Sequence, residues 1–250
     1  MSGHSHWATI KRKKGAGDAK RGQLFTKLAK EIVLAARDGG DPDTNFRLRL
    51  AIDKARSNNM PKDSIDRAIK RGTGADKDGL VYEDVTYEGY GPKGVALIIE
   101  CVTENRNRTV ADVRHALTRA NGNLGESGSV AWQFSRKAYF LISECSMDFD
   151  ALFELALEAG ADDIQQNDDG SIEIYADVEN FKAISDALFA AGLHIDEGEI
   201  KQIPNQPMEL SKEDTLQVLR VVDALDELDD VNNVYHNMVV SDDIYDEMED

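Results

Sequence analysis

The chain has 250 residues, of which 41% are hydrophobic and 30% are charged, a composition typical of a globular protein with two or three domains. Its 47 Asp and Glu outnumber its 29 Lys and Arg, so the formal net charge is −18. No stretch approaches the roughly 18 apolar residues of a membrane span, and two cysteines without CxxC spacing exclude a disulfide framework. We therefore expect a cytoplasmic protein with no membrane contact.

The charge is distributed very unevenly along the chain. Residues 1–75 hold 17 Lys and Arg against 8 Asp and Glu, whereas the rest of the chain holds 12 against 39. Such asymmetry suggests a basic module that binds a polyanion, attached to a body that the same polyanion would repel.

The N-terminal part is predicted to be helical. Residues 1–22, rich in glycine and lacking an apolar period, are predicted to form a flexible basic arm. From Gln23 a four-residue repeat, from Leu24 to Ala36, predicts a helix that stops at Gly39 and Gly40. Apolar faces predict further helices around Leu48–Ala55 and Ile65–Ile69, separated by a break at Asn58–Pro61.

The pattern changes to α+β at about residue 79. Strands are predicted around Tyr82–Tyr87, Val95–Val102 and Val130–Phe134. A capping-box sequence, Thr109–Asp112, predicts the start of a helix that ends at Asn121.

Residues 138–203 contain a diverged internal repeat at a spacing of 32. Phe140 and Ile142 of the first copy correspond to Ile172 and Ile174 of the second. The aligned positions predict the order strand, helix, strand, helix, with Glu199–Ile203 as a last strand, so the two units predict a compact domain of split βαβ type.

The C-terminal part is predicted to complete the middle domain. Ser211–Asp214 has capping-box form and predicts a helix, and a strand is predicted near Val234–Val240. The predicted fold class is α+β, with an N-terminal helical domain followed by two ferredoxin-like domains, the third inserted in the second. The expected boundaries are 1–78 for the arm and helical domain, 79–134 with 205–241 for the discontinuous domain, 135–204 for the insertion, and 242–250 for an acidic tail.

Several candidate sites have simpler explanations. Gly89–Gly94 matches the dinucleotide fingerprint GxGxxG, but that motif needs a following helix, and Pro92 removes a backbone donor. A glycine-rich hairpin between two strands explains the sequence better. The histidines lack ligand spacing, and no catalytic motif pairs a nucleophile with a base. We therefore predict no cofactor, no metal, no small-molecule substrate and no enzymatic activity.

A candidate anion pocket lies at Arg106, Arg108 and Thr109. Two guanidiniums beside a helix N-terminus could bind a phosphate. The alternative is that both arginines pair with carboxylates of the chain, and the residue pattern does not decide between the two.

The basic module is the main candidate site. The predicted phosphate-binding residues are Lys11, Arg12, Lys13, Lys14, Lys20, Arg21, Lys27, Arg47, Arg49, Lys54, Arg56, Lys62, Arg67, Lys70 and Arg71. Affinity for nucleic acid rises with the number of phosphates neutralised, and a merely solvated surface explains this clustering less well. Because the module has few aromatic residues, a duplex or folded target fits better than stacking on a single strand.

The chain closely resembles the YebC/PmpR family along essentially its full length. The motifs that carry the resemblance are Met1–Ser5, Lys20–Gly22 with Phe25–Lys27, Arg47–Lys54, Asn59–Lys62, Tyr87–Pro92, Asn105–His115 and Gly122–Gly125. Two positions depart from the family pattern: His6 stands where a lysine is usual, and Lys93 where a glycine is usual.

The resemblance implies three domains, with the third inserted in the second, and a non-enzymatic regulator. Bacterial members are described as DNA-binding transcriptional regulators, and a mitochondrial branch as translational activators. Relief of ribosome stalling has also been proposed for bacterial members.

Three functional hypotheses follow from the sequence. The leading one is a DNA-binding transcriptional regulator that acts with the transcription machinery. The second is a ribosome-associated translation factor that binds ribosomal or transfer RNA, because no clear base-reading recognition helix is evident. The third is a protein-interaction adaptor that uses the acidic domains.

Overall fold

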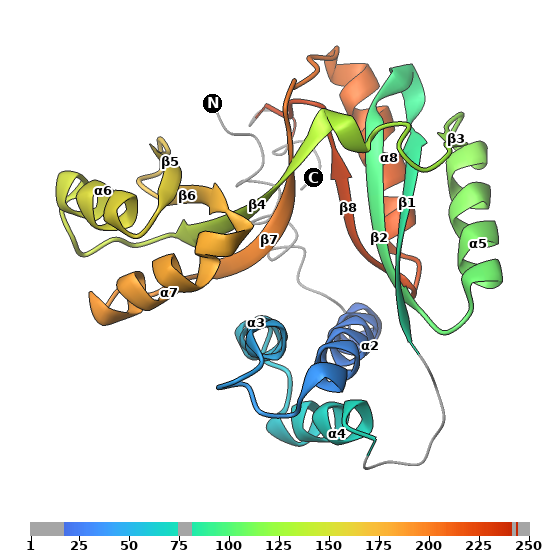
Figure 1. Ribbon diagram of the computed structural model, residues 1–250. Coiled ribbons are helices and arrows are strands. Elements are labelled where there is room, and N and C mark those ends of the chain that lie inside the picture. The colour runs from blue at the N-terminus through green and yellow to red at the C-terminus, as the bar shows by residue number, and fades with distance from the viewer. Residues whose placement is uncertain (1–17, 75–81, 242–243, 245–250) are drawn as a thin grey trace. The chain divides into compact units, whose positions relative to one another are not determined.

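The computed structural model describes residues 18–74, 82–241 and 244 (Figure 1). The predicted arm residues before Asp18 and most of the predicted acidic tail, 242–250, lie outside these ranges. The described chain forms two compact units. One comprises residues 136–203, and the other comprises the described residues before 136 together with those from 204 onward.

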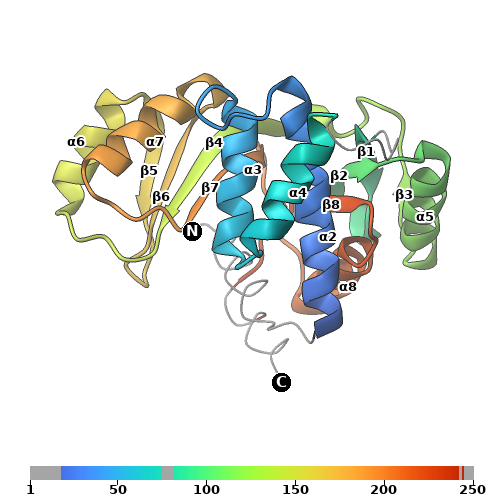
Figure 2. The ribbon, with the colours of Figure 1, turned by 90° about the horizontal axis from the view of Figure 1, so that it is seen from below.

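The helical part consists of α2 (Asp18–Ala35), α3 (Phe46–Ser57) and α4 (Lys62–Gly72). The three helices pack side by side (Figure 2) around a core that includes Ile32, Leu48 and Ile65. The predicted apolar face of α3 is buried as expected. The arm was predicted to extend to residue 22, but residues 18–22 form the beginning of α2 instead.

Asn45 connects the end of α2 to the start of α3. Its Oδ1 atom accepts a hydrogen bond from the backbone N–H of Leu48, which caps α3. Its Nδ2 group donates to the carbonyls of Ala35 and Gly39, both at 2.7 Å. One buried side chain thus satisfies backbone groups at the ends of both helices.

The middle α+β part contains a four-stranded sheet in the order β3-β1-β2-β8. Its strands are β1 (Glu83–Tyr90), β2 (Ala96–Thr103), β3 (Asn123–Leu124) and β8 (Val231–His236), and each neighbouring pair is antiparallel. Helices α5 (Arg106–Arg119) and α8 (Lys212–Asp226) contact each other and the sheet. The C-terminal helix and strand therefore return to the sheet that β1 and β2 begin.

The glycine-rich segment between β1 and β2 is a hairpin connection, as predicted. The N–H of Gly91 donates to the Val95 carbonyl at 2.8 Å, and Lys93 and Gly94 have φ angles of 63° and 81°. A strand rather than a helix follows, so the segment lacks the helix N-terminus that a dinucleotide pyrophosphate needs.

Three predicted element boundaries in this part are wrong. Strand β8 ends at His236, whereas the prediction continued to Val240. Helix α5 begins at Arg106 and is capped by Asn105, whereas Thr109 lies buried inside the helix. Residues 131–133 form a 3₁₀ turn, and the next strand begins only at Phe134. The reason is that the backbone N–H groups of Val130 and Ala131 donate to the Glu88 carboxylate, both at 2.8 Å, and so cannot join a sheet ladder.

The unit of residues 136–203 is a second four-stranded sheet with two helices. Strands β4 (Phe134–Ile142), β5 (Ala161–Gln166), β6 (Ile172–Asp177) and β7 (Glu197–Pro204) have the order β5-β6-β4-β7. Helices α6 (Phe149–Glu158) and α7 (Phe181–Ala190) each have ten residues, and their bounds differ by the 32 residues of the repeat. Phe140 of β4 and Phe181 of α7 pack against each other in the core, with tilted rings whose centroids are 4.5 Å apart.

The structure is thus a helical part followed by two α+β parts with antiparallel four-stranded sheets, the predicted fold class. We propose the predicted division at 1–78, 79–134 with 205–241, 135–204 and 242–250 as the domain organisation. The support for this division is that β8 pairs with β2, although the residues of the second sheet lie between these two strands in the sequence.

A close approach between α2 and α4 gives the first prediction. A Cβ atom added at Gly72 would lie 2.3 Å from the Val33 carbonyl oxygen and 2.6 Å from the Ala36 Cβ. Gly72→Ala should therefore lower the free energy of unfolding by about 1–3 kcal/mol through overpacking. Gly22→Ala, in the same bundle but with open space around its Cβ, should instead be neutral or stabilising by up to about 1 kcal/mol. Urea unfolding followed by circular dichroism measures both, and equal effects would contradict the packing argument.

Candidate nucleic-acid interface

The predicted phosphate-binding residues fall into three groups. Lys11, Arg12, Lys13 and Lys14 lie outside the described residues, and the structure describes only the backbone of Lys20. Arg21 is exposed in the first turns of α2. The remaining residues form two groups. In one group, each cationic side chain contacts carbonyl or carboxylate oxygen atoms of other residues; the residues of the other group lie on α4.

Five predicted residues contact such oxygen atoms. They are Lys27 with the Asp226 carbonyl, Arg47 with the Asp84 carboxylate, Arg49 with the Pro42 and Asp43 carbonyls, Lys54 with the Glu31 carboxylate, and Arg56 with the Asp53 carboxylate. The exposed pairs, such as Arg47 with Asp84, are weak and could exchange with a phosphate. These residues are therefore not fully available as cations.

Helix α4 carries the other group: Lys62, Arg67, Lys70 and Arg71. All four side chains are exposed, and within residues 18–74 and 82–241 no carboxylate pairs with them. The Arg67 guanidinium donates to the Asp63 carbonyl and to the Ser64 hydroxyl, at 3.2 and 3.1 Å. Asp63 and Asp66 lower the net charge of this helix but leave it positive.

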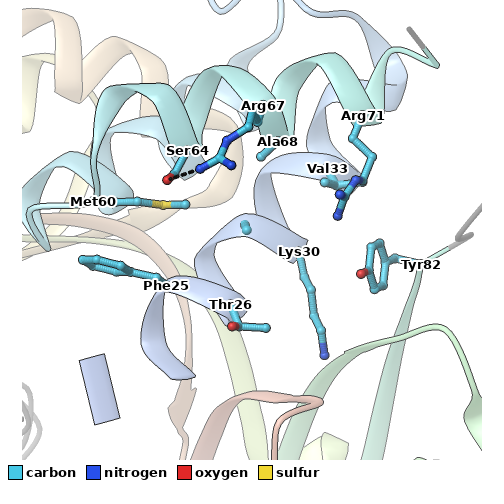
Figure 3. Close-up of a pocket in the computed structure, with 11 residues that line it drawn as sticks. Phe25, Thr26, Lys30, Val33, Met60, Ser64, Arg67, Ala68, Arg71 and Tyr82 are labelled. Carbon is cyan, nitrogen blue, oxygen red and sulfur yellow. Dashed lines mark hydrogen bonds between the residues drawn. The ribbon is translucent and has the colours of Figure 1, made fainter. Parts of the chain in front are cut away.

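A groove of about 320 Å³ runs between α2 and α4. We call it the α2–α4 groove; it is lined by Phe25, Thr26, Ala29, Lys30, Val33, Met60, Ser64, Arg67, Ala68, Arg71 and Tyr82. Arg67 and Arg71 extend from α4, while Lys30 and Tyr82 line the opposite side (Figure 3). The groove thus combines an apolar floor with two guanidiniums spaced one helical turn apart.

Lys30 lines this groove, but a buried carboxylate neutralises its charge. Its Nζ atom lies 2.7 Å from Asp230 Oδ1 and 2.9 Å from the Asp229 carbonyl oxygen. The same Nζ lies 5.9 Å from the centre of the Tyr82 ring, within range of a cation–π contact. Arg67 and Arg71 therefore remain the cations of the groove that have no carboxylate partner in the described parts of the chain.

Asp230 is the centre of a buried polar cluster. Its Oδ2 atom accepts from Arg108 at 2.8 Å, and the hydroxyls of Thr109 and Thr103 lie at 2.8 and 3.1 Å from it. Burial alone would raise the pKa of Asp230, but the hydrogen bonds from Lys30, Arg108 and Thr109 lower it to about 2. The carboxylate thus stays charged and joins α2, β2 and α5 to the segment before β8.

The three residues of the candidate anion pocket all have partners within the chain. Arg108 contacts Asp230 and Glu104, Thr109 contacts Asp230, and Arg106 pairs with Glu83 at 2.7 Å. This is the second of the two interpretations that the sequence left open. A phosphate binding here would have to displace carboxylates, one of which is buried.

A second cavity, of about 520 Å³, shares Thr26 and Lys30 with the groove. Its lining includes the acidic residues Asp112, Glu227, Asp229 and Asp230. This lining makes it a poor site for an anion. Among the described residues, no group of three His, Cys, Asp or Glu could hold a metal ion, and no helix is long and apolar enough to cross a membrane.

Comparisons with known proteins agree with this architecture. Residues 5–75 match the model of the TACO1/YebC protein N-terminal domain, and residues 82–238 match that of the TACO1/YebC second and third domain. The chain belongs to the TACO1/YebC family.

Relatives in the TACO1/YebC family align over the whole chain. A protein of Idiomarina loihiensis is 52% identical over 100% of both chains. One of Chlorobium chlorochromatii is 53% identical over 96% of both. Both are named "Probable transcriptional regulatory protein". The crystal structure of a conserved hypothetical protein from Aquifex aeolicus is 40% identical, with a TM-score of 0.80, and covers 90% of this chain and 93% of its own.

Sequence reasoning did not identify the groove of this TACO1/YebC family member. Phe25 and Tyr82 carry no local signal of the groove, because they become neighbours of Arg67 and Arg71 only when α2, α4 and the residue before β1 pack together. Lys30 is one of the 17 basic residues of 1–75, and its sequence neighbours give no sign of its pairing with Asp230, a residue 200 positions away.

The Asp230 cluster gives the second prediction. Asp230→Ala leaves Lys30 buried without its counter-charge and should cost about 3–5 kcal/mol of stability. The native pKa of Asp230 is about 2, and that of an unfolded Asp is about 4. The contribution of the charged carboxylate to stability is therefore complete above about pH 4. It declines as the pH falls towards 2, since the unfolded state takes up a proton first. The difference in stability between the natural chain and the variant should therefore shrink over this range.

Asp229→Ala provides the matched control. Asp229 is exposed, and its contact with Lys30 uses the backbone carbonyl, which the substitution keeps. Urea unfolding from pH 2 to 7 should show little change for this variant. A pH-independent difference for Asp230→Ala would contradict a charged buried carboxylate.

Proposed function

We propose that this TACO1/YebC family member is a non-enzymatic regulator of gene expression that binds nucleic acid through α4 and the α2–α4 groove. The observation that carries the proposal is the pair Arg67 and Arg71. Both are exposed on α4 at the groove, and neither has a carboxylate partner within the described residues. Two guanidiniums so placed suit phosphate oxygens.

The rest of the charge distribution supports the same surface. Lys62 and Lys70 are exposed on the same helix, and the basic arm with Lys11–Lys14 precedes α2 in the sequence. Outside residues 1–75 acidic residues outnumber basic ones by 39 to 12. Repulsion of a polyanion by these parts would restrict binding to the basic module.

The leading form of this function is transcriptional regulation by binding DNA in the cytoplasm. Its support is that the relatives are named as probable transcriptional regulatory proteins, together with the connection between α3 and α4. Residues 58–61 form a four-residue turn in which Asn59 is left-handed, with φ of 58°. This length is typical of helix-turn-helix motifs, whose second helix enters the major groove. The partners would be DNA and the transcription machinery.

A second candidate is a ribosome-associated translation factor that binds ribosomal or transfer RNA. The observation that favours it is the composition of α4, whose polar residues are Lys, Arg, Asp and Ser, without Asn or Gln. Lysine and arginine bind phosphates of any sequence and otherwise read guanine, whereas Asn and Gln, the usual readers of adenine, are absent from this helix. Such a surface fits the backbone of a folded RNA as well as it fits DNA.

Binding measured at several salt concentrations tests the role of the groove. Arg67→Ala with Arg71→Ala should weaken binding to a DNA duplex and to transfer RNA. It should also lower the salt slope by up to about 1.8, since each lost phosphate contact on duplex DNA removes about 0.9. The matched control is Arg114→Ala with Arg119→Ala, which removes two exposed charges from α5. Equal losses for both pairs would leave only a general charge effect and would contradict the proposed surface.

The arm is tested separately. Replacing Lys11, Arg12, Lys13 and Lys14 by alanine should weaken binding to all sequences alike. It should also lower the salt slope by up to about 3.6, the loss expected for four phosphate contacts. Unchanged affinity at low salt would exclude the arm from the interface.

Crosslinking in cells, followed by sequencing of the bound nucleic acid, then separates the two candidate functions. If the natural chain crosslinks to promoter DNA and the Arg67 and Arg71 variant does not, the result supports transcriptional regulation. If the nucleic acid that the variant fails to crosslink is ribosomal RNA, the result supports a translation factor.

A further inference from the structure

Helix α6 carries two parallel rows of side chains that the core of its unit does not use. Phe149, Phe153 and Leu157 form an apolar row at four-residue spacing, and Asp150, Glu154 and Glu158 form an acidic row beside it. We call the two rows the α6 strip. Leu152 and Ala156, both fully buried, already fill the contact between α6 and the sheet.

The apolar row lies largely in solvent. The exposed fractions of Phe153 and Leu157 are 40% and 54%. Phe149 is half-buried, and its ring lies 6.2 Å from that of Phe153, which makes the row continuous. A continuous exposed apolar row bordered by charge is typical of an interaction surface, whereas single exposed apolar residues are common and need no explanation.

The surrounding sequence has only one sign of charge. Residues 138–181 contain no Lys, Arg or His, but they contain twelve Asp and Glu. Such a surface repels nucleic acid and anionic lipid and attracts cations. A symmetric contact with a second copy would bring two acidic surfaces together, which costs free energy through like-charge repulsion.

We propose that the α6 strip binds a cationic segment of a partner protein, rich in Lys and Arg and carrying large apolar side chains at helical spacing. The apolar side chains would bury Phe153 and Leu157, and the basic ones would face Asp150, Glu154 and Glu158. This mode corresponds to an amphipathic helix that binds along an apolar surface, with complementary charge fixing its orientation. The strip shares no residue with the α2–α4 groove, so this inference does not depend on binding of nucleic acid.

The test uses the full chain and a fluorescently labelled helical peptide of leucine and lysine, with anisotropy as the readout. Two control peptides isolate the contributions: one with serine in place of leucine, and one with glutamate in place of lysine. The leucine–lysine peptide should bind, and both controls should bind at least about tenfold more weakly. The serine control lacks the apolar contacts with the strip, and the glutamate control lacks the complementary charge. Equal binding of the serine control would reduce the contact to charge alone and overturn the proposal.

Variants then locate the contact. Phe153→Ser with Leu157→Ser should weaken peptide binding by about tenfold or more, the usual effect of truncating central interface residues. Glu154→Gln with Glu158→Gln should weaken it and reduce its dependence on salt. The matched controls, Phe189→Ser on α7, where the ring is 81% exposed, and Asp168→Asn with Asp169→Asn in the β5–β6 turn, should keep the affinity of the natural chain.

Three further results would overturn the inference. One is that the control variants weaken binding of the peptide as much as the strip variants do. A second is that sedimentation shows self-association of the natural chain that Phe153→Ser with Leu157→Ser abolishes, because the strip would then bind a second copy. Circular dichroism of each variant checks folding, and retained peptide affinity in a folded strip variant also counts against the proposal.

Discussion

The structure depends on the buried contact between Lys30 and Asp230. A carboxylate out of water is stable only when charge and hydrogen bonds compensate it, and here Lys30, Arg108, Thr103 and Thr109 surround it. These groups come from α2, from the end of β2, from the start of α5 and from the segment before β8. The cluster therefore fixes α2 against the first α+β sheet and holds one wall of the α2–α4 groove in place.

This contact also determines which cations remain for a ligand. Lys30 lies in the groove but already has a counter-charge, whereas Arg67 and Arg71 have no carboxylate partner among the described residues. The groove's positive potential therefore comes from α4. The acidic α6 strip has the opposite character, since residues 138–181 contain no basic side chain. One chain thus carries separate surfaces suited to a polyanion and to a cationic protein segment.

Local patterns predicted most of the fold because they reflect local physics. The apolar faces of α3 and α4, the Ser211 cap and the 32-residue repeat all follow from periodicity and capping within a few residues. The errors have tertiary causes. Thr109 resembles a cap, but its hydroxyl contacts Asp230, and residues 130–131 resemble a strand, but their N–H groups bind Glu88. Both competing partners lie at least 40 residues away in the sequence.

The sequence by itself determined the segregation of charge, the helical and α+β parts, and the family, because composition, periodicity and motif order are properties of the linear chain. Only the tertiary structure decided which basic residues are available. Arg47, Lys54 and Arg108 contact carboxylates, Lys30 is buried, and Arg67 and Arg71 line a groove with Phe25 and Tyr82. The physical reason is that a charge interacts with whatever lies within a few ångströms, and for Lys30 that neighbour is 200 residues away in the chain.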